Sequence, residues 1–431
     1  MDTSYSAGLT KSDWLCLSFL SGIGPARLSR LYTYLTQLYL IQPQSSTSQD
    51  PNETAPLFDH SQADERTDDL LSYELLRALK WPDITAREAM DYFSNGTLTQ
   101  EQETKREQSL AWLAEPNHHL VLQEDMHYPE ALKEISVAPA FLYVEGSRDA
   151  LLLPKIGIVG ARKCTRHGRE VTLKLAEQLS HHGICVVSGG AMGIDTAAHQ
   201  GALDSKTTPT IAVMGTGLLH RYPAHNKPLF ERILEQGGAL ISEYPLTTSP
   251  RPHLFPPRNR IISGVSMGVL VAEASIKSGS LISASYAVQQ NRDVFALPGR
   301  LSDKQSEGCH QLLRQGATLV RCVEDIVEEC SPRLLAFDNT AEKGTPEKDT
   351  SPYYTTTNGT SFGPSGRQPM PESISDEAKA VADLMEKEAM PMDFDALIRH
   401  TNLSAGLLMQ VLMELELSGC IENREGLYGR C

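Results

Sequence analysis

The sequence KIGIVGARKCTRHG, residues 155–168, places a short apolar run directly before a turn that contains glycine. The same pattern returns at residues 184–199, ICVVSGGAMGIDTAAH, where apolar residues lead into the turn SGGAMG. In both stretches a helical sequence follows the turn. Short, continuous apolar strands that alternate with helices are typical of a parallel sheet covered on both faces. The two stretches therefore predict a doubly wound α/β fold.

The alternation of strand and helix continues further along the chain. We expect more strands at 210–214, 239–242, 269–272 and 293–296, and helices across 228–236 and 281–290. In such a sheet, ligands bind beyond the carboxyl ends of the strands, at the point where the strand order reverses. The sequence therefore predicts a Rossmann-like, mainly parallel sheet with a ligand site at one edge.

Charge is unevenly distributed along the 431 residues. The 39 Lys and Arg residues against 54 Asp and Glu residues give a formal net charge of −15, which alone argues against a nucleic-acid ligand. Residues 155–321, however, contain 19 basic and 11 acidic residues and carry +8, so the rest of the chain carries −23. A basic core between acidic segments favours an anionic ligand for the core.

Composition divides the chain into four segments. Apolar residues three or four apart predict a helical domain over 1–115, with a polar, disordered insertion near 42–69. The Rossmann-like core, with the short strands and helix that lead into it, is expected over 118–330. A linker is expected over 331–374. Residues 375–431 predict a winged-helix domain, with three helices followed by two short strands.

Cysteine spacing and the apolar runs suggest the compartment. The eight cysteines form no CxxC pair, and their spacing indicates neither a metal site nor a disulfide framework. No basic, apolar leader is present at the start, and no run approaches the ~20 apolar residues that a membrane helix needs. We expect a reduced, cytoplasmic protein with no metal, no cofactor and no membrane contact.

The ends of the predicted strands carry groups suited to anions. Glycine lets backbone amides approach an anion, and the N-terminus of the following helix adds a favourable dipole. A row of such turns along one edge suits a chain of phosphates, as in single-stranded nucleic acid. The candidate DNA-binding residues are Gly160, Arg162, Ser188, Gly189, Gly190, Lys227, Arg258, Arg260, Ser278, Gly279 and Ser280.

Other residues near these turns have roles that the sequence leaves open. Arg258 and Arg260 either add charge for phosphates or brace a loop by pairing with Glu243 or Glu273. Three further residues are expected to shape the site: Asp195, His199 and Asn259. The aromatic residues available for base stacking are Tyr222, Tyr244 and Phe255.

Coenzyme and enzyme motifs are missing from the core. The first turn is not GxGxxG, the second strand ends in Ser188 rather than an acidic residue, and no GxxxxGK[ST] loop occurs. Glu243 and Glu273 follow strands, where a general acid could stand, and Asp195 and His199 lie one helical turn apart. We favour a shaping role for Asp195 and His199.

From about residue 125 to 320 the chain resembles the DNA-processing protein A (DprA/Smf) family. The motifs that carry the resemblance are GARKCTRHG (160–168), SGGAMGIDTAAH (188–199), TIAVMGTGLLHRYPAHN (210–226), GGALISEYP (237–245), FPPRNRIISG (255–264), SGSLISA (278–284) and VFALPG (294–299). The resemblance implies a homodimer that binds and protects single-stranded DNA and loads the RecA recombinase during natural transformation. It also implies no enzymatic activity, a sterile-alpha-motif-like N-terminal domain and an accessory winged helix.

Three alternatives are weighed beside this interpretation. A Rossmann-like nucleotide hydrolase of the lysine-decarboxylase-like type shares the fold, but its PGGxGTxxE motif is absent. A duplex-specific regulator would use the winged helix, yet its third helix, residues 404–418, has no basic residue and residues 376–431 carry −6. The turn at 22–28, GIGPARL, resembles a helix-hairpin-helix turn that either meets a DNA phosphate or simply joins two packed helices.

Overall fold

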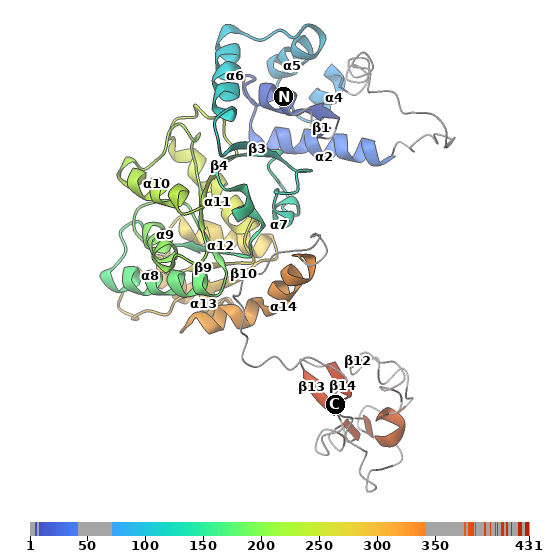
Figure 1. Cartoon of the computed structure of the whole chain (residues 1–431), viewed down its shortest axis with the longest axis vertical. Helices are drawn as coiled ribbons and strands as arrows, with labels where there is room; N and C mark the ends of the chain where they lie inside the picture. The colour runs from blue at the N-terminus through green and yellow to red at the C-terminus, as the bar shows by residue number, and fades with distance from the viewer. Residues whose placement is uncertain are drawn as a thin grey trace. The chain divides into compact units, whose positions relative to one another are not determined.

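Figure 1 shows the computed structural model of the chain. It describes residues 5–6, 8–41 and 71–341, together with scattered residues between 375 and 430. The insertion predicted near 42–69 and most of the linker predicted over 331–374 lie outside the described residues. The chain divides into two compact units, Met1–Thr345 and Pro346–Cys431.

A sheet of nine strands forms the centre of the first unit. In chain order the strands are β3 (His118–Leu122), β4 (Phe141–Gly146), β5 (Lys155–Val159), β6 (Cys185–Ser188), β7 (Thr210–Val213), β8 (Ala239–Ser242), β9 (Gly268–Val271), β10 (Asp293–Ala296) and β11 (Thr318–Leu319). In space their order is β11-β10-β9-β5-β6-β7-β8-β4-β3. The strands from β5 to β11 run parallel, and β4 and β3 add antiparallel pairs at one edge. The predicted Rossmann-like fold class is confirmed.

The strand order reverses at β5. From β5 the chain adds β6, β7 and β8 on one side, and then returns to add β9, β10 and β11 on the other. Gly157 of β5 is paired with Val187 of β6 and with Val269 of β9, so the three strands end close to one another. This reversal creates a crevice beyond the carboxyl ends of β5 and β9.

Helices cover both faces of the sheet (Figure 1). They are α7 (Glu130–Lys133), α8 (Arg166–His181), α9 (Ile194–Ser205), α10 (Lys227–Glu235), α11 (Phe255–Gly264), α12 (Ser280–Gln289), α13 (Glu307–Arg314) and α14 (Val323–Ala341). Alternate strand residues enter different cores, because successive side chains point to opposite faces. Val186 packs with Leu175 and Leu179 of α8, whereas Val187 joins the cluster that contains Ile261 and Ile262 of α11.

Two segments differ from the predicted layout. Residues 255–264, where no helix was predicted, form α11. Its prolines at the second and third positions are tolerated because they lie in the first turn, where an amide needs no helical partner. Residues 331–341, expected as linker, continue α14 past Pro332 to Ala341. The apolar residues of α14, such as Val323, Ile326 and Cys330, pack on the sheet and stabilise this helix.

The N-terminal helices pack directly on one edge of the sheet. The elements are β1 (Tyr5–Ser6), β2 (Leu9–Thr10), α1 (Lys11–Leu17), α2 (Pro25–Ile41), α4 (Tyr73–Ala78), α5 (Asp83–Asn95) and α6 (Gln100–Leu113). Their fully buried Trp14 and Trp81 belong to the same apolar cluster as Phe141 and Tyr143 of β4. The helices and the sheet therefore share one continuous core.

The second unit contains a small antiparallel sheet with an apolar cluster. Its strands are β12 (Met392–Asp393), β13 (Ile421–Arg424) and β14 (Leu427–Arg430), in the order β12-β14-β13. Leu397, Leu408 and Leu415 are fully buried in this unit. Within the described residues, no helix has the length and apolar character that crossing a bilayer requires.

Candidate nucleic-acid interface

A cavity of about 480 Å³ lies at the reversal of strand order. We call it the switch-point cavity. It is lined by the turn after β5, the first residues of α9, α11 and α12, and Gln305. Eight of the predicted site residues line it: Gly160, Arg162, Asp195, Arg258, Asn259, Ser278, Gly279 and Ser280. Residues from four distant parts of the sequence thus meet at the edge where the fold predicts a ligand.

Glycines allow the turn after β5 to pack against the start of α9. A Cβ at Gly160 would lie 2.6 Å from the Ile194 side chain, and one at Gly193 would lie 2.3 Å from the carbonyl oxygen of Ala161. Gly193 also has a φ of +84°, which residues with a side chain rarely adopt. The tight turn leaves Arg162 and Lys163 exposed beside the cavity.

The exposed cations in this turn are not neutralised. Neither Arg162 nor Lys163 forms an ion pair with any described residue, and the Arg162 guanidinium carbon lies 5.9 Å from the centre of the Phe255 ring. That ring contacts Tyr222 in turn, with centroids 5.6 Å apart and planes tilted by 49°. Arg162, Phe255 and Tyr222 therefore form a row that offers both a charge and aromatic faces.

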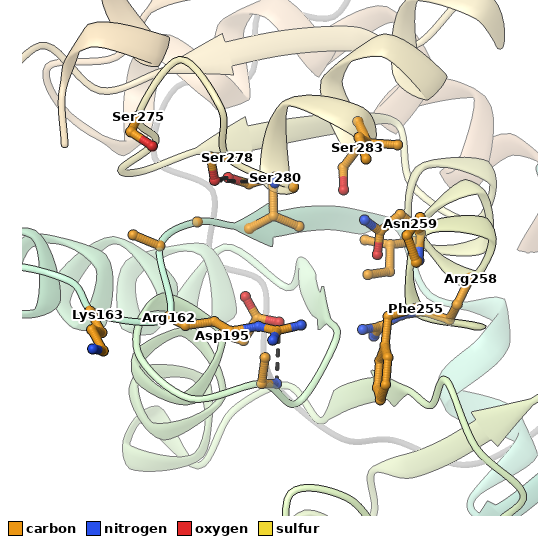
Figure 2. A pocket seen from close by; sticks show the side chains of 18 of the residues that line it. Arg162, Lys163, Asp195, Phe255, Arg258, Asn259, Ser275, Ser278, Ser280 and Ser283 are labelled. Atoms are coloured by element: carbon orange, nitrogen blue, oxygen red, sulfur yellow. Dashed lines mark hydrogen bonds between the residues drawn. The ribbon is translucent and has the colours of Figure 1, made fainter. Parts of the chain in front are cut away.

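Hydroxyl groups form the wall opposite Arg162 and Lys163 (Figure 2). The Oγ atoms of Ser278 and Ser280 lie 2.5 Å apart, and the backbone N–H of Ser280 donates to Ser278 Oγ at 3.3 Å. Ser280 is also the first residue of α12, whose positive dipole end lies at this wall. The buried Ser283 hydroxyl has no hydrogen-bond partner among the described residues. The serine wall thus offers donors to an anion.

Arg258 supplies a buried charge at the floor of the cavity. It is 4% exposed, and its Nη1 donates to the Val213 carbonyl oxygen. Burial lowers the pKa of Arg258 to about 10, so it stays protonated at neutral pH. Asp195 lies beside it, accepts a hydrogen bond from the Ala191 N–H at 3.3 Å, and has a pKa that burial raises. Gly189 makes room for this guanidinium, since a Cβ there would lie 2.2 Å from Arg258 Nη1.

Arg260 points away from the cavity. Its Nη1 and Nη2 donate to the two carboxylate oxygens of Glu243, both at 2.6 Å, and its Nε donates to the Val137 carbonyl at 3.1 Å. Two interpretations of Arg260 were open: a contact with phosphates, or a pairing with a glutamate that braces the chain. The structure supports the second, because every nitrogen of the guanidinium already has a partner. Glu273 braces a different segment: it accepts hydrogen bonds from the N–H of Thr165, at 2.8 Å, and from its hydroxyl.

Three residues predicted to donate to DNA lie beneath the cavity instead. The Ser188 hydroxyl is fully buried and donates to the Ile158 carbonyl oxygen at 2.6 Å. The Arg258 guanidinium lies over Gly189. Gly190, at φ +64°, packs against the Phe230 ring. The Ser188 hydroxyl is therefore engaged within the sheet. The SGG turn shapes the floor of the cavity, and direct contact of DNA with the Gly189 and Gly190 amides stays a prediction.

Lys227 and His199 also lie apart from the switch-point cavity. Lys227 is exposed at the start of α10, where it lines a separate depression with Glu145, Arg221 and Glu231. His199 is fully buried, and its Nδ1 lies 2.8 Å from Thr210 Oγ1. Burial lowers the pKa of His199 to about 3.

Sequence reasoning missed several residues that line the cavity. They are Lys163, Ser275, Ser283 and Gln305. Lys163 could have been predicted as a site residue, because it adjoins Arg162 in the same turn. The serines depend on which face of α12 and its leading loop meets the sheet edge, which the sequence does not specify. No group of three or more His, Cys, Asp or Glu suited to a metal occurs in the part of the chain that the structure describes.

The charge of the cavity is positive. Three cations, Arg162, Lys163 and Arg258, line it against one carboxylate, Asp195. Glu243 and Glu273, the two acidic residues that follow strands, are held by Arg260 and Thr165 and do not line it. The arrangement favours binding of an anion over acid–base chemistry.

Comparison with known proteins gives a consistent result. A family model described as DNA recombination-mediator protein A matches residues 119–331, and a DprA winged helix domain model matches residues 365–426. Protein Smf of Escherichia coli K12 is 37% identical over 327 residues, which are 75% of this chain and 80% of that protein. DNA processing protein DprA of Streptococcus pneumoniae is 45% identical over 202 residues, 47% of this chain and 71% of that one. The X-ray structure of DprA from Streptococcus pneumoniae covers 74% of this chain and 98% of its own, with a TM-score of 0.58 and 31% identity.

Proposed function

The chain belongs to the DNA recombination-mediator protein A family, DprA/Smf, and we propose that it binds single-stranded DNA in the switch-point cavity. The observation that carries this proposal is the meeting of three cations and a row of serine hydroxyls around one crevice with a single carboxylate. A flexible single strand, whose phosphates and bases are both accessible, can enter such a crevice more readily than a stiff duplex.

Each wall of the cavity has a part in this proposal. Arg162 holds a phosphate through two parallel N–H donors, and Lys163 adds a point charge. The Ser278 and Ser280 hydroxyls donate to a second phosphate at the start of α12. Phe255 and Tyr222 offer faces on which bases stack without regard to sequence. Arg258 contributes through its buried charge, and its Nη1 is already engaged with the Val213 carbonyl oxygen.

We infer a wider role from the family. The chain acts as a non-catalytic recombination mediator in the cytoplasm: as a homodimer it protects incoming single strands and loads RecA onto them during natural transformation. The family and the anion-binding cavity support this role, and so does the engagement of Glu243 and Glu273 in bracing contacts. The alternative nucleotide hydrolase would have to rely on Asp195, because neither Glu243 nor Glu273 lines the cavity.

Matched fluorescence-anisotropy titrations test DNA binding. Labelled single-stranded and duplex probes of unrelated sequence are titrated with wild type, Arg162→Ala and Arg87→Ala at several salt concentrations. Arg87 is the control, because it is also an exposed arginine and it pairs with Asp83 on α5, away from the cavity. We expect preference for the single strand, with log K falling linearly against log salt. Arg162→Ala should weaken binding about tenfold and reduce the salt slope by about 0.7, whereas Arg87→Ala should leave both unchanged.

Two results would overturn the proposal. Equal affinity for duplex and single-stranded DNA would contradict the expectation that the crevice favours a single strand. An unchanged affinity of Arg162→Ala would place the DNA elsewhere. Release of free base from nucleoside monophosphates by the wild-type protein would favour the hydrolase instead.

A further inference from the structure

A second cavity, of about 550 Å³, lies where the N-terminal helices meet the sheet. It is formed by α1, α6, β3, the turn at residues 125–127 and the 3-10 helix η1 (Arg148–Leu152). We call it the seam cavity. β3 is the outermost strand on the side opposite β11, and the seam cavity shares no lining residue with the switch-point cavity. Nothing in the proposed DNA interface accounts for it.

The floor of the seam cavity is apolar. Leu15 of α1, Leu110 and Leu113 of α6, and Leu120 and Val121 of β3 all contribute to it. Leu110 is 37% exposed, so part of this apolar floor is open to solvent. A volume of about 550 Å³ falls within the range of pockets that enclose small organic molecules. The floor therefore suits the apolar body of a ligand.

The rim of the seam cavity carries uncompensated positive charge. Lys11 pairs with Asp125 at 3.6 Å, and Arg106 pairs with Glu103. Asp125 is the only carboxylate in the lining, and its Oδ2 also accepts the Leu122 N–H at 2.8 Å. Arg148 is exposed and forms no ion pair with any residue that the structure describes.

Histidines surround this unpaired arginine. His127 Nε2 lies 3.0 Å from Asp149 Oδ1, whereas His119 has no hydrogen-bond partner among the described residues. The pKa of His119 is lowered, first by burial and then by the nearby Arg148 and His127. Its neutral imidazole thus lies in a positive environment that an anion would relieve.

We propose that the seam cavity binds a small organic phosphate, with the phosphate on Arg148 and the apolar body on Leu110, Leu113 and Val121. A guanidinium suits phosphate because it presents two parallel donors, and His119 adds a third donor beside it. The ligand bridges α6 and β3, so it ties the N-terminal helices to the sheet. This inference does not depend on DNA binding at the switch-point cavity.

Isothermal titration of the full-length protein with phenyl phosphate and with inorganic phosphate tests the proposal. Phenyl phosphate should bind at least about tenfold more tightly than inorganic phosphate, because only the former covers the leucine floor. Two independent variants should weaken it by about tenfold or more: Arg148→Ala removes the charge, and Leu110→Glu places a carboxylate at the floor. Both positions are exposed enough to tolerate the change in a folded protein, which circular dichroism checks.

Controls separate this site from the DNA interface. Arg162→Ala should bind phenyl phosphate like wild type, and Arg148→Ala should bind single-stranded DNA like wild type. Proton NMR should show the His119 pKa rising when phenyl phosphate is bound. Absence of binding at millimolar phenyl phosphate, equal affinity for the two phosphates, or unchanged affinity in both variants would overturn the proposal.

Discussion

Removing the charge of Glu243 should destabilise the first unit strongly. The Arg260–Glu243 pair is buried, with side chains 9% and 2% exposed, and it is held by two hydrogen bonds of 2.6 Å. Glu243→Gln keeps the volume but leaves the Arg260 charge buried without its counter-charge. Breaking a buried pair in this way costs about 3–5 kcal/mol of the free energy of unfolding. The change acts on α11, which also presents Phe255, Arg258 and Asn259 to the switch-point cavity.

Urea unfolding followed by tryptophan fluorescence measures this cost. The three tryptophans, Trp14, Trp81 and Trp112, are all buried in the first unit, so their emission reports its unfolding. The double variant Glu243→Gln/Arg260→Met removes both charges, and it should recover most of the stability that Glu243→Gln loses. A Glu243→Gln protein within about 1 kcal/mol of wild type would refute the reasoning, because that is the contribution of an exposed pair. If the folded double variant lost affinity for DNA, Arg260 would have to be considered a residue that contacts DNA.

Two further changes test the floor and walls of the switch-point cavity, and a third tests the buried His199. Gly189→Ala should cost about 1–3 kcal/mol in urea unfolding and weaken single-strand binding, because its Cβ would overlap the Arg258 guanidinium; wild-type behaviour would place Arg258 elsewhere. Phe255→Leu should weaken single-strand binding by about 1–3 kcal/mol without changing the salt slope, and a changed slope would contradict a stacking role. The free energy of unfolding should fall by about 2 kcal/mol between pH 6.5 and pH 5 through His199. In the unfolded chain this histidine binds a proton near pH 6.5, whereas in the native protein its buried imidazole, with a pKa of about 3, stays neutral over this range. His199→Gln should lack that part of the pH dependence in urea unfolding, and an identical pH profile would disprove it.

The strands and the glycine turns were predictable because their signals are local. An apolar run followed by glycine describes a strand and its turn within ten residues, and β5, β6 and β7 lie where the sequence predicted them. Gly160 and Arg162 are adjacent to the end of β5, so their place at the sheet edge follows from the strand alone. The antiparallel order of β3 and β4 depends on long-range pairing, which the sequence does not reveal.

The different fates of Arg258 and Arg260 show why side-chain roles were harder to predict. In an extended loop both arginines could reach a ligand. In α11, residues two apart point about 200° away from each other, because each residue turns the helix by about 100°. One guanidinium therefore lies under the cavity and the other against Glu243. Ser188 raises the same issue at a strand end, where its hydroxyl donates to the neighbouring strand rather than to a ligand.

The contacts around the N-terminal GIGPARL turn show which of its two interpretations holds. The N–H of Ser21 donates to a Glu88 carboxylate oxygen at 2.9 Å, and the Arg27 guanidinium donates to the carbonyls of Gly22 and Lys80 at 2.8 Å and 3.1 Å. A carboxylate from α5 thus accepts a hydrogen bond from the amide just before the turn, and the Arg27 guanidinium donates to two carbonyl oxygens. Of the two interpretations of this turn, its contacts support the joining of packed helices. Arg27 of α2 and Glu88 of α5 therefore tie the turn to the helices around it, which is the part expected of a turn that joins packed helices.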